Sequence, residues 1–133
     1  MTKEQLCEKA KEAMQNSYSP YSGCKVGAAL LSYSGKVYLG CNIENASFSP
    51  TICAERSAIA SAVSAGERNF RAIAVCGGKN GVLDGAFYPC GVCRQVLREF
   101  CTDDFEIYVL TKEEIISLTL KDLLPYSFSN EVM

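Results

Sequence analysis

Two short segments, Cys53-Ala54-Glu55-Arg56 and Pro89-Cys90-Gly91-Val92-Cys93-Arg94, decide how this chain is organised. Together they supply three thiols at metal-ligand spacing and one carboxylate beside the first thiol. Three thiolates leave one position of a tetrahedral zinc ion open for water. Zinc lowers the pKa of that water towards neutrality, and a nearby carboxylate can then handle its protons. The pattern is therefore typical of a hydrolytic site with one Zn²⁺ per subunit.

The spacing within each segment indicates where the metal lies. Cys90 and Cys93 are three residues apart, so in the first turn of a helix they share one face. Cys53 and Glu55 would diverge by about 200° inside a helix. Both reach one point only beyond the helix N-terminus, towards which first-turn side chains lean. The sequence therefore predicts zinc between two helix N-termini, held by Cys53, Cys90 and Cys93, with Glu55 as a proton shuttle.

An arginine ends each segment and suggests how the charge of the site is balanced. Three thiolates on Zn²⁺ leave a net charge of about −1, which by itself makes a bound water less acidic. Hydrogen bonds from Arg56 and Arg94 to sulfur would offset this charge. We therefore predict both arginines as charge-compensating residues.

Length, charge and cysteine content restrict the class of protein. The 133 residues are expected to form one domain, residues 1–133. The net charge of −2 and the absence of a basic stripe favour a small-molecule partner over nucleic acid. The sequence shows neither a signal peptide nor a membrane-spanning apolar run, so we expect a cytoplasmic location and no membrane partner. Eight cysteines in such a compartment indicate metal binding or catalysis, not disulfides.

The order of the expected elements indicates an α/β layered domain. Hydrophobic periodicity predicts a first helix, opened by a Thr2–Gln5 capping box, and a hairpin that turns at Ser34-Gly35. The expected helices cover 3–16, 53–65, 90–100 and 120–124. The expected strands cover 26–33, 36–40, 71–76, 105–110 and, most weakly, 115–119.

A polar stretch follows the second strand of the hairpin. If it stays extended, Asn42 and Glu44 point to the same side, with Ile43 on the other. Two polar groups on one side suit hydrogen bonding to a sugar. The alternative is a solvated polar loop.

The two zinc segments resemble the zinc-deaminase signature, with Cys53 at the position where other members have histidine. Further stretches along the whole chain resemble the small homotetrameric cytidine deaminases, in the same order and at similar spacing. These stretches are Ser19-Pro20-Tyr21-Ser22, Val26-Gly27-Ala28-Ala29-Leu30, Asn42-Ile43-Glu44-Asn45-Ala46-Ser47, Gln95-Val96 and Leu123-Leu124-Pro125.

The resemblance implies hydrolytic deamination of cytidine and 2′-deoxycytidine to uridine and 2′-deoxyuridine plus ammonia, in pyrimidine salvage. It implies a three-layer α-β-α sandwich with a mixed five-stranded sheet. It also implies a homotetramer with shared active sites, in which Ala46 to Phe48 and Phe128 complete the pocket of a neighbouring copy. The substrate-binding residues that it implies are Asn42, Glu44, Ala46, Phe48, Ala54 and Phe128.

This sequence departs from the family pattern at two positions. The family usually has phenylalanine in place of Cys24, where the ring packs against the pyrimidine, and tyrosine in place of Phe48. Loss of one aromatic–base contact weakens binding by about 1–3 kcal/mol. The pocket is then roomier and accepts a modified cytosine nucleoside, unless Phe128 of a neighbour supplies the stacking.

Several alternatives to a nucleoside deaminase stay open. The enzyme alternatives are a deaminase of a blasticidin-type compound and an editor of cytosine in RNA or DNA. The stretch 42–46 favours a ribose over the first, and the acidic composition disfavours the second. The non-enzyme alternative is a structural zinc module, which is usually closed by four ligands. Cys24 is a candidate for such a fourth ligand.

Overall fold

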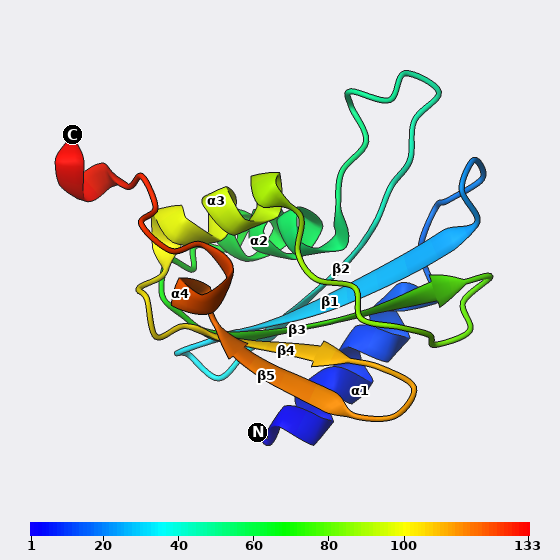
Figure 1. The fold of residues 1–133 in the computed structure, drawn as a ribbon, viewed down its shortest axis with the longest axis horizontal. Helices are drawn as coiled ribbons and strands as arrows, with labels where there is room; N and C mark the ends of the chain where they lie inside the picture. The colour runs from blue at the N-terminus through cyan, green and yellow to red at the C-terminus, as the bar shows by residue number, and fades with distance from the viewer.

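A mixed sheet with the strand order β2-β1-β3-β4-β5 forms the centre of the molecule (Figure 1). The computed structural model describes residues 1–133. β3 and β4 are parallel, and the other neighbouring strands are antiparallel. The strands are β1 (Cys24–Ser32), β2 (Val37–Cys41), β3 (Phe70–Lys79), β4 (Glu106–Leu110) and β5 (Ile115–Thr119). The helices are α1 (Lys3–Met14), α2 (Ala54–Ser64), α3 (Gly91–Phe100) and α4 (Leu120–Leu123), with a 3₁₀ turn at Asn130–Val132.

Helices cover both faces of this sheet and confirm the predicted three-layer sandwich. Figure 1 shows α1 on one face and α2 and α3 on the other. Two separate apolar clusters fill the space between the sheet and its helices, one between the sheet and α1 and the other between the sheet and α2 and α3. The run Ala72–Cys76 in β3 is buried throughout because helices cover both sides of that strand. No helix is both long enough and apolar enough to span a membrane.

The predicted elements are all present, with ends displaced by a few residues. The Thr2–Gln5 capping box forms, and α1 ends at Met14 instead of residue 16. β3 is longer than predicted at both ends, and the weakly predicted strand 115–119 pairs with β4 along its length. Cys53 and Cys90 are the N-cap residues of α2 and α3 and not their first helical residues.

Two glycines allow the helices to approach the sheet closely. A Cβ at Gly27 in β1 would overlap the backbone of α1 at Ala10 and Met14. A Cβ at Gly40 in β2 would overlap the backbone of α2 at Ala54 and Ala58. Backbone-to-backbone contact of this kind tolerates no side chain. Gly40 therefore allows the short distance between the sheet and the first turn of α2, and this turn carries residues of the first zinc segment.

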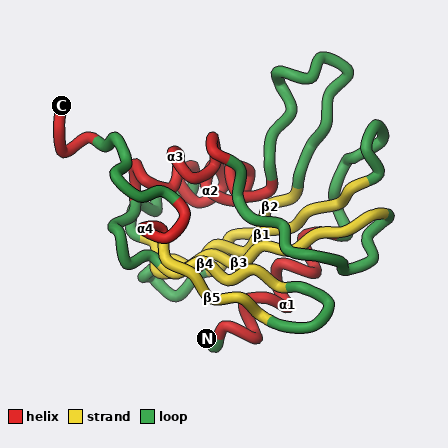
Figure 2. The backbone as a smooth tube through the Cα atoms, viewed as in Figure 1, coloured by secondary structure: helices red, strands yellow, loops and turns green.

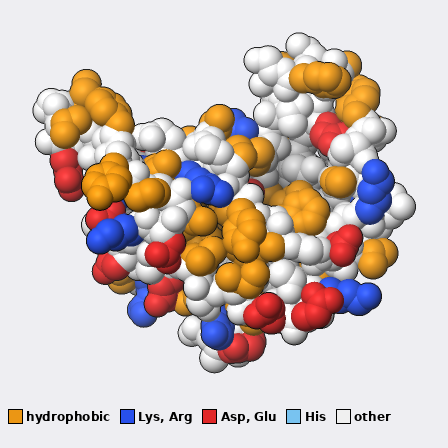
Figure 3. Space-filling view, viewed as in Figure 1, with side chains coloured by type: hydrophobic (Ala, Val, Ile, Leu, Met, Phe, Trp, Pro, Cys, Tyr) orange, Lys and Arg blue, Asp and Glu red, His pale blue; other side chains and the backbone are white.

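Two segments project from the same side of the molecule (Figure 2). One is the connection between β2 and α2, and the other is the C-terminal tail. Figure 3 shows hydrophobic side chains on both projections and a hollowed surface between them. The exposed aromatic residues on these segments are Phe48, Tyr126 and Phe128.

Candidate active site

The three cysteines of the two zinc segments come together between the N-termini of α2 and α3. Their sulfur atoms all lie within 4.8 Å of one another. The Sγ of Cys90 lies 3.7 Å from that of Cys53 and 3.6 Å from that of Cys93. Tetrahedral zinc with Zn–S bonds of 2.3 Å requires sulfur atoms about 3.8 Å apart. The thiol cluster therefore has the donor type and the spacing that a zinc ion needs.

The surroundings of the cluster favour the thiolate form of Cys53 and the thiol form of Cys93. Hydrogen bonds from the Cys93 thiol and from Arg56 lower the pKa of Cys53 to about 5. The pKa of Cys93 is raised, because it shares its proton with Cys53 and is buried. Helix N-termini add a positive potential that stabilises anionic sulfur. One ligand is therefore readily ionised, whereas metal binding must displace the proton of another.

Arg56, one of the two arginines predicted as charge-compensating residues, lies beside the sulfur cluster. Its Nη2 donates to the Sγ of Cys53 at 3.5 Å, and this bond raises the pKa of the guanidinium. Its Nε is buried and has no hydrogen-bond partner. A half-buried cation with spare donor capacity next to three sulfurs fits a cluster that carries excess negative charge.

Arg94 differs from its prediction as a charge-compensating residue. Its Nε donates to the carbonyl of Pro89 at 2.6 Å, and its Nη1 donates to the carbonyl of Leu123 at 2.7 Å. Its side chain leans towards the helix N-terminus, as long side chains in helices do, and meets carbonyl oxygens there instead of sulfur. Arg94 thus connects the loop that precedes Cys90 to the C-terminal end of α4 through these two hydrogen bonds.

Glu55 is buried in the first turn of α2 and has no ionic partner at hydrogen-bonding distance. Burial raises the pKa of its carboxyl to about 7, and the nearby charge of Cys53 contributes to the rise. Arg56 acts in the opposite direction and lowers this pKa. A carboxyl whose pKa lies near neutrality can both accept and donate a proton at physiological pH.

Glu55 and two of the cysteines line a hollow of about 210 Å³ next to the cluster. Asn42, Glu44 and Ala54 line the same hollow, so the structure brings these predicted residues together. The rest of the lining was not predicted from the sequence, because residues outside a recognisable site motif carry no local signal of their position in space. These residues are Val26, Thr51, Ile52, Phe87 and Tyr88.

The side chains of Asn42 and Glu44 already make hydrogen bonds within the chain. The donors and acceptors that these bonds leave free determine what the two side chains can bind. The Oδ1 of Asn42 accepts from Ser17 and from the amide of Val26, and its Nδ2 donates to Cys24. Glu44 accepts from both backbone and side chain of the loop at residues 21–22. One N–H of Asn42 and one lone pair on Glu44 are left over. That donor and acceptor match a hydroxyl group, which can accept from one and donate to the other.

Three predicted substrate-binding residues lie outside the hollow of this chain. Ala46 and Phe48 are exposed on the projecting connection between β2 and α2, and Phe48 is 80% exposed. Phe128 is exposed on the C-terminal tail. Cys24 follows the side-chain alternation of β1 onto the face of Val26, yet it does not line the hollow.

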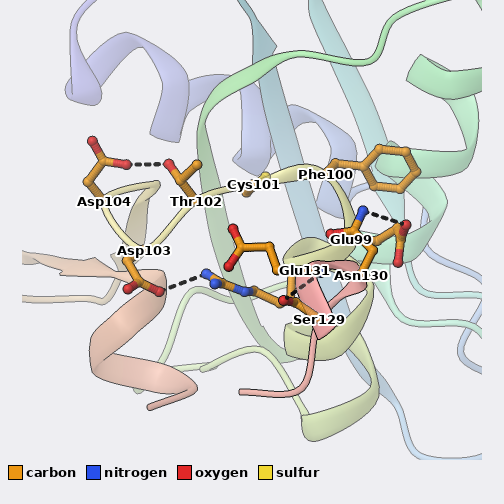
Figure 4. Close-up of a pocket in the computed structure, with 10 residues that line it drawn as sticks. Glu99, Phe100, Cys101, Thr102, Asp103, Asp104, Ser129, Asn130 and Glu131 are labelled. Atoms are coloured by element: carbon orange, nitrogen blue, oxygen red, sulfur yellow. Dashed lines mark hydrogen bonds and ion pairs between the residues drawn. The ribbon is translucent and has the colours of Figure 1, made fainter. Parts of the chain in front are cut away.

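A second hollow, of about 420 Å³, lies where the C-terminal tail meets the end of α3 (Figure 4). Its side chains bond to one another: Arg98 pairs with Asp103 at 2.7 Å, and Asn130 donates to Glu99. Gln95 donates to the carbonyl of Phe128 nearby. None of the three zinc-segment cysteines lines this hollow. Its contacts attach the tail to α3.

Comparison with known proteins gives consistent matches along the chain. A family model described as the cytidine and deoxycytidylate deaminase zinc-binding region matches residues 1–109. A curated cytidine deaminase of Sporosarcina psychrophila is 46% identical over 132 residues, covering 98% of this chain and 94% of the relative. A cytidine deaminase of Halalkalibacterium halodurans is 42% identical over 134 residues, covering 100% of this chain and 98% of the relative.

Solved structures of the same kind superpose on this fold. A crystal structure of cytidine deaminase from Burkholderia pseudomallei has a TM-score of 0.88 at 45% identity, and covers 96% of this chain and 100% of its own. One from Mycobacterium tuberculosis has a TM-score of 0.82 at 36% identity, with coverage of 96% and 98%. Sequence and architecture therefore agree over almost the entire length.

Proposed function

The chain belongs to the cytidine and deoxycytidylate deaminase family of zinc enzymes, and we propose that the hollow beside its three cysteines is where a cytosine nucleoside is deaminated. The reaction is hydrolytic, and it converts cytidine or 2′-deoxycytidine into uridine or 2′-deoxyuridine plus ammonia. One observation carries this assignment to these residues. A buried, unpaired Glu55 shares one hollow with the cysteine cluster and with Asn42 and Glu44.

A zinc ion bound at this site would supply the nucleophile, because zinc held by three protein ligands lowers the pKa of its water to about 7. Cys53, Cys90 and Cys93 would hold the ion, and Arg56 would offset the charge of the thiolates through its bond to Cys53. Buried Ala54 and half-buried Ile52 line the hollow and limit the access of bulk water to it. Exclusion of water strengthens each of these electrostatic interactions.

Glu55 moves the protons of the reaction. In its ionised form its carboxylate would accept a proton from the attacking water and deliver it to a ring nitrogen of the base. It would then accept the proton of the hydroxyl newly added to the ring and pass it to the amino group, which leaves as ammonia. The elevated pKa of Glu55 suits both roles near neutral pH. Asn42 and Glu44 orient the nucleoside through a ribose hydroxyl, using the one donor and the one acceptor that their bonds to the chain leave free.

An ultraviolet assay tests the assignment against its alternatives. Cytidine, 2′-deoxycytidine, a blasticidin-type compound and a short single-stranded oligonucleotide are offered separately to protein of known zinc content. We expect turnover of the two nucleosides alone. Turnover of the blasticidin-type compound only would support the first alternative, and turnover of the oligonucleotide would support the second. Full zinc occupancy without any turnover would indicate a structural zinc module.

Replacing Arg56 by glutamine tests charge compensation. The variant should retain zinc, and the acidic limb of its pH–kcat/KM profile should move to higher pH. Removing the cation leaves the thiolate charge uncompensated and removes an influence that lowers the pKa of Glu55, so the carboxylate needs a higher pH to form. Arg94→Gln is the matched comparison, because Arg94 donates to carbonyls instead of sulfur. An Arg56→Gln profile that coincides with the wild-type profile would contradict the role.

We also propose that the protein is a homotetramer in which neighbouring copies complete each active site. Three observations support this: Phe48 is 80% exposed, Phe128 is 64% exposed, and both lie on segments that project from one side (Figure 3). Large aromatic side chains exposed on projecting segments favour an interaction surface. Sedimentation of the free protein should show a tetramer, and Phe128→Ala should raise KM. An active monomer would exclude shared pockets.

The cysteines support a cytoplasmic role in pyrimidine salvage. All eight are free, and three of them must stay reduced to bind zinc. The cytoplasm keeps thiols reduced, whereas extracellular compartments oxidise them. A deaminase that acts on free nucleosides there converts cytosine nucleosides into uracil nucleosides for reuse.

A further inference from the structure

Two adjacent aromatic residues, Phe87 and Tyr88, line the hollow on the side of the second zinc segment. Phe87 is held by the sheet, because its ring lies directly on the backbone of β3 at Gly77. A Cβ at Gly77 would come within 2.9 Å of two of its ring atoms. Phe87 therefore closes the wall of the hollow and anchors the segment that carries Tyr88.

The ring of Tyr88 has no comparable partner in its own chain. Tyr88 is 47% exposed although it lines the hollow. The aromatic pair of this fold is Phe70 with Phe100, and its cation–π pair is Arg71 with Tyr33, so Tyr88 takes part in neither. An aromatic side chain at the wall of a hollow with an uncovered face can contact a flat ligand.

Tyr88 also lies at the end of the hollow where the base must react. It precedes the N-cap residue Cys90 by two positions, and it shares the hollow with Glu55. Asn42 and Glu44 provide the polar groups for the sugar. The wall formed by β1 offers aliphatic Val26, and Cys24 brings no ring to that strand. Exposed Tyr21 lies beside Glu44 at the sugar end, and Phe48 and Phe128 lie on projecting segments from which they would reach a neighbouring copy, so Tyr88 is the exposed ring that this chain itself contributes to the hollow.

We propose that Tyr88 is a substrate-binding residue whose ring stacks on the pyrimidine of the bound nucleoside and so replaces an aromatic contact that Cys24 cannot make. The proposal rests on the proposed function and deepens it, because it names the group that holds the base as distinct from the sugar. Stacking acts equally on the ground state and on the transition state, so it contributes to KM and not to kcat.

Three substitutions of Tyr88 distinguish the contribution of its aromatic ring from the contributions of side-chain size and of the hydroxyl group. Tyr88→Ala and Tyr88→Leu should raise KM for cytidine by roughly 5- to 150-fold, the range that loss of a base–aromatic contact gives, with kcat within about twofold. Tyr88→Phe keeps the ring and should keep KM within about threefold. Tyr33→Leu is the matched control, because Tyr33 follows the opposite end of β1 from the hollow. Zinc content is measured for every variant.

Each outcome decides the proposal. A wild-type KM for Tyr88→Leu would show that bulk suffices, and a large rise in KM for Tyr88→Phe would assign the effect to the hydroxyl. Either result overturns stacking. A structural role would give a different result. Tyr88→Ala and Tyr88→Leu would then lose kcat and zinc together, Tyr88→Phe would retain both, and the zinc-loaded fraction of each variant would show the wild-type KM. This result would also overturn stacking.

Binding without turnover keeps this test separate from the test of function. Calorimetric titration of cytidine into Glu55→Ala protein, with and without Tyr88→Leu, measures the same contact when no reaction occurs. Tyr88→Leu should weaken this binding by a similar factor. Failure of wild-type protein to deaminate any cytosine nucleoside would overturn the proposed function alone, whereas equal affinities in this titration would overturn the role of Tyr88 alone.

Discussion

Replacing Glu55 by alanine should leave the protein folded and zinc-loaded but reduce kcat by 10²- to 10⁴-fold or more, because the reaction loses its proton shuttle. Glu55 is buried, has no ionic partner at hydrogen-bonding distance and lies outside the cluster of three sulfurs. Its removal therefore takes away no metal ligand. Steady-state deamination of cytidine and zinc per subunit are the two measurements.

The comparison variants for Glu55 isolate its chemistry from its burial. Glu55→Gln keeps the size of the side chain but cannot accept a proton, so it should be as inactive as Glu55→Ala. Glu8→Ala removes a carboxylate that is exposed on α1 and should leave kcat unchanged. Loss of zinc in Glu55→Ala would make Glu55 a ligand, and substantial residual kcat would assign proton transfer to another group.

The positions of the metal ligands were predictable because local geometry determines them. The Cys90–Cys93 spacing and the short Cys53–Glu55 gap are compatible with one metal only at helix N-termini, and both helices begin there. The layers were predictable for a similar reason, since the uninterrupted apolar run in β3 requires cover on both faces.

Contacts between distant parts of the chain were not predictable in this way. Arg94 follows a predicted ligand in sequence, as a charge-compensating residue would. Its guanidinium nevertheless donates to the carbonyl of Leu123, which is 29 residues later in the sequence. Phe87 and Tyr88 lie in an irregular segment without periodicity, and their place in the lining of the hollow depends on tertiary contacts such as that of Phe87 with Gly77. The side-chain bonds of Asn42 to Ser17 and Cys24 likewise depend on tertiary structure.

Gly40 connects this tertiary structure to the chemistry, and its replacement by valine should both destabilise the fold and damage the metal site. Any side chain at residue 40 overlaps the helical backbone at the Ala54 carbonyl and the Ala58 amide. Because backbone cannot move aside as a flexible side chain can, we expect a loss of about 3 kcal/mol or more in the free energy of unfolding. The first turn of α2 must then lift from the sheet and carry Glu55 and the adjacent Cys53 with it.

Comparison of Gly40 with two other glycines separates this displacement from general destabilisation. Gly27→Val overlaps α1 on the opposite face, so it should destabilise the protein by a similar amount while zinc affinity changes little. A Cβ at Gly85 meets no atom within 4 Å, so Gly85→Val should change neither property. Urea denaturation and zinc titration of the folded fraction provide both measurements. Equal loss of zinc affinity in Gly40→Val and Gly27→Val would show that stability alone governs metal binding, whereas selective loss in Gly40→Val would show that the contact between β2 and α2 positions Cys53 for the metal.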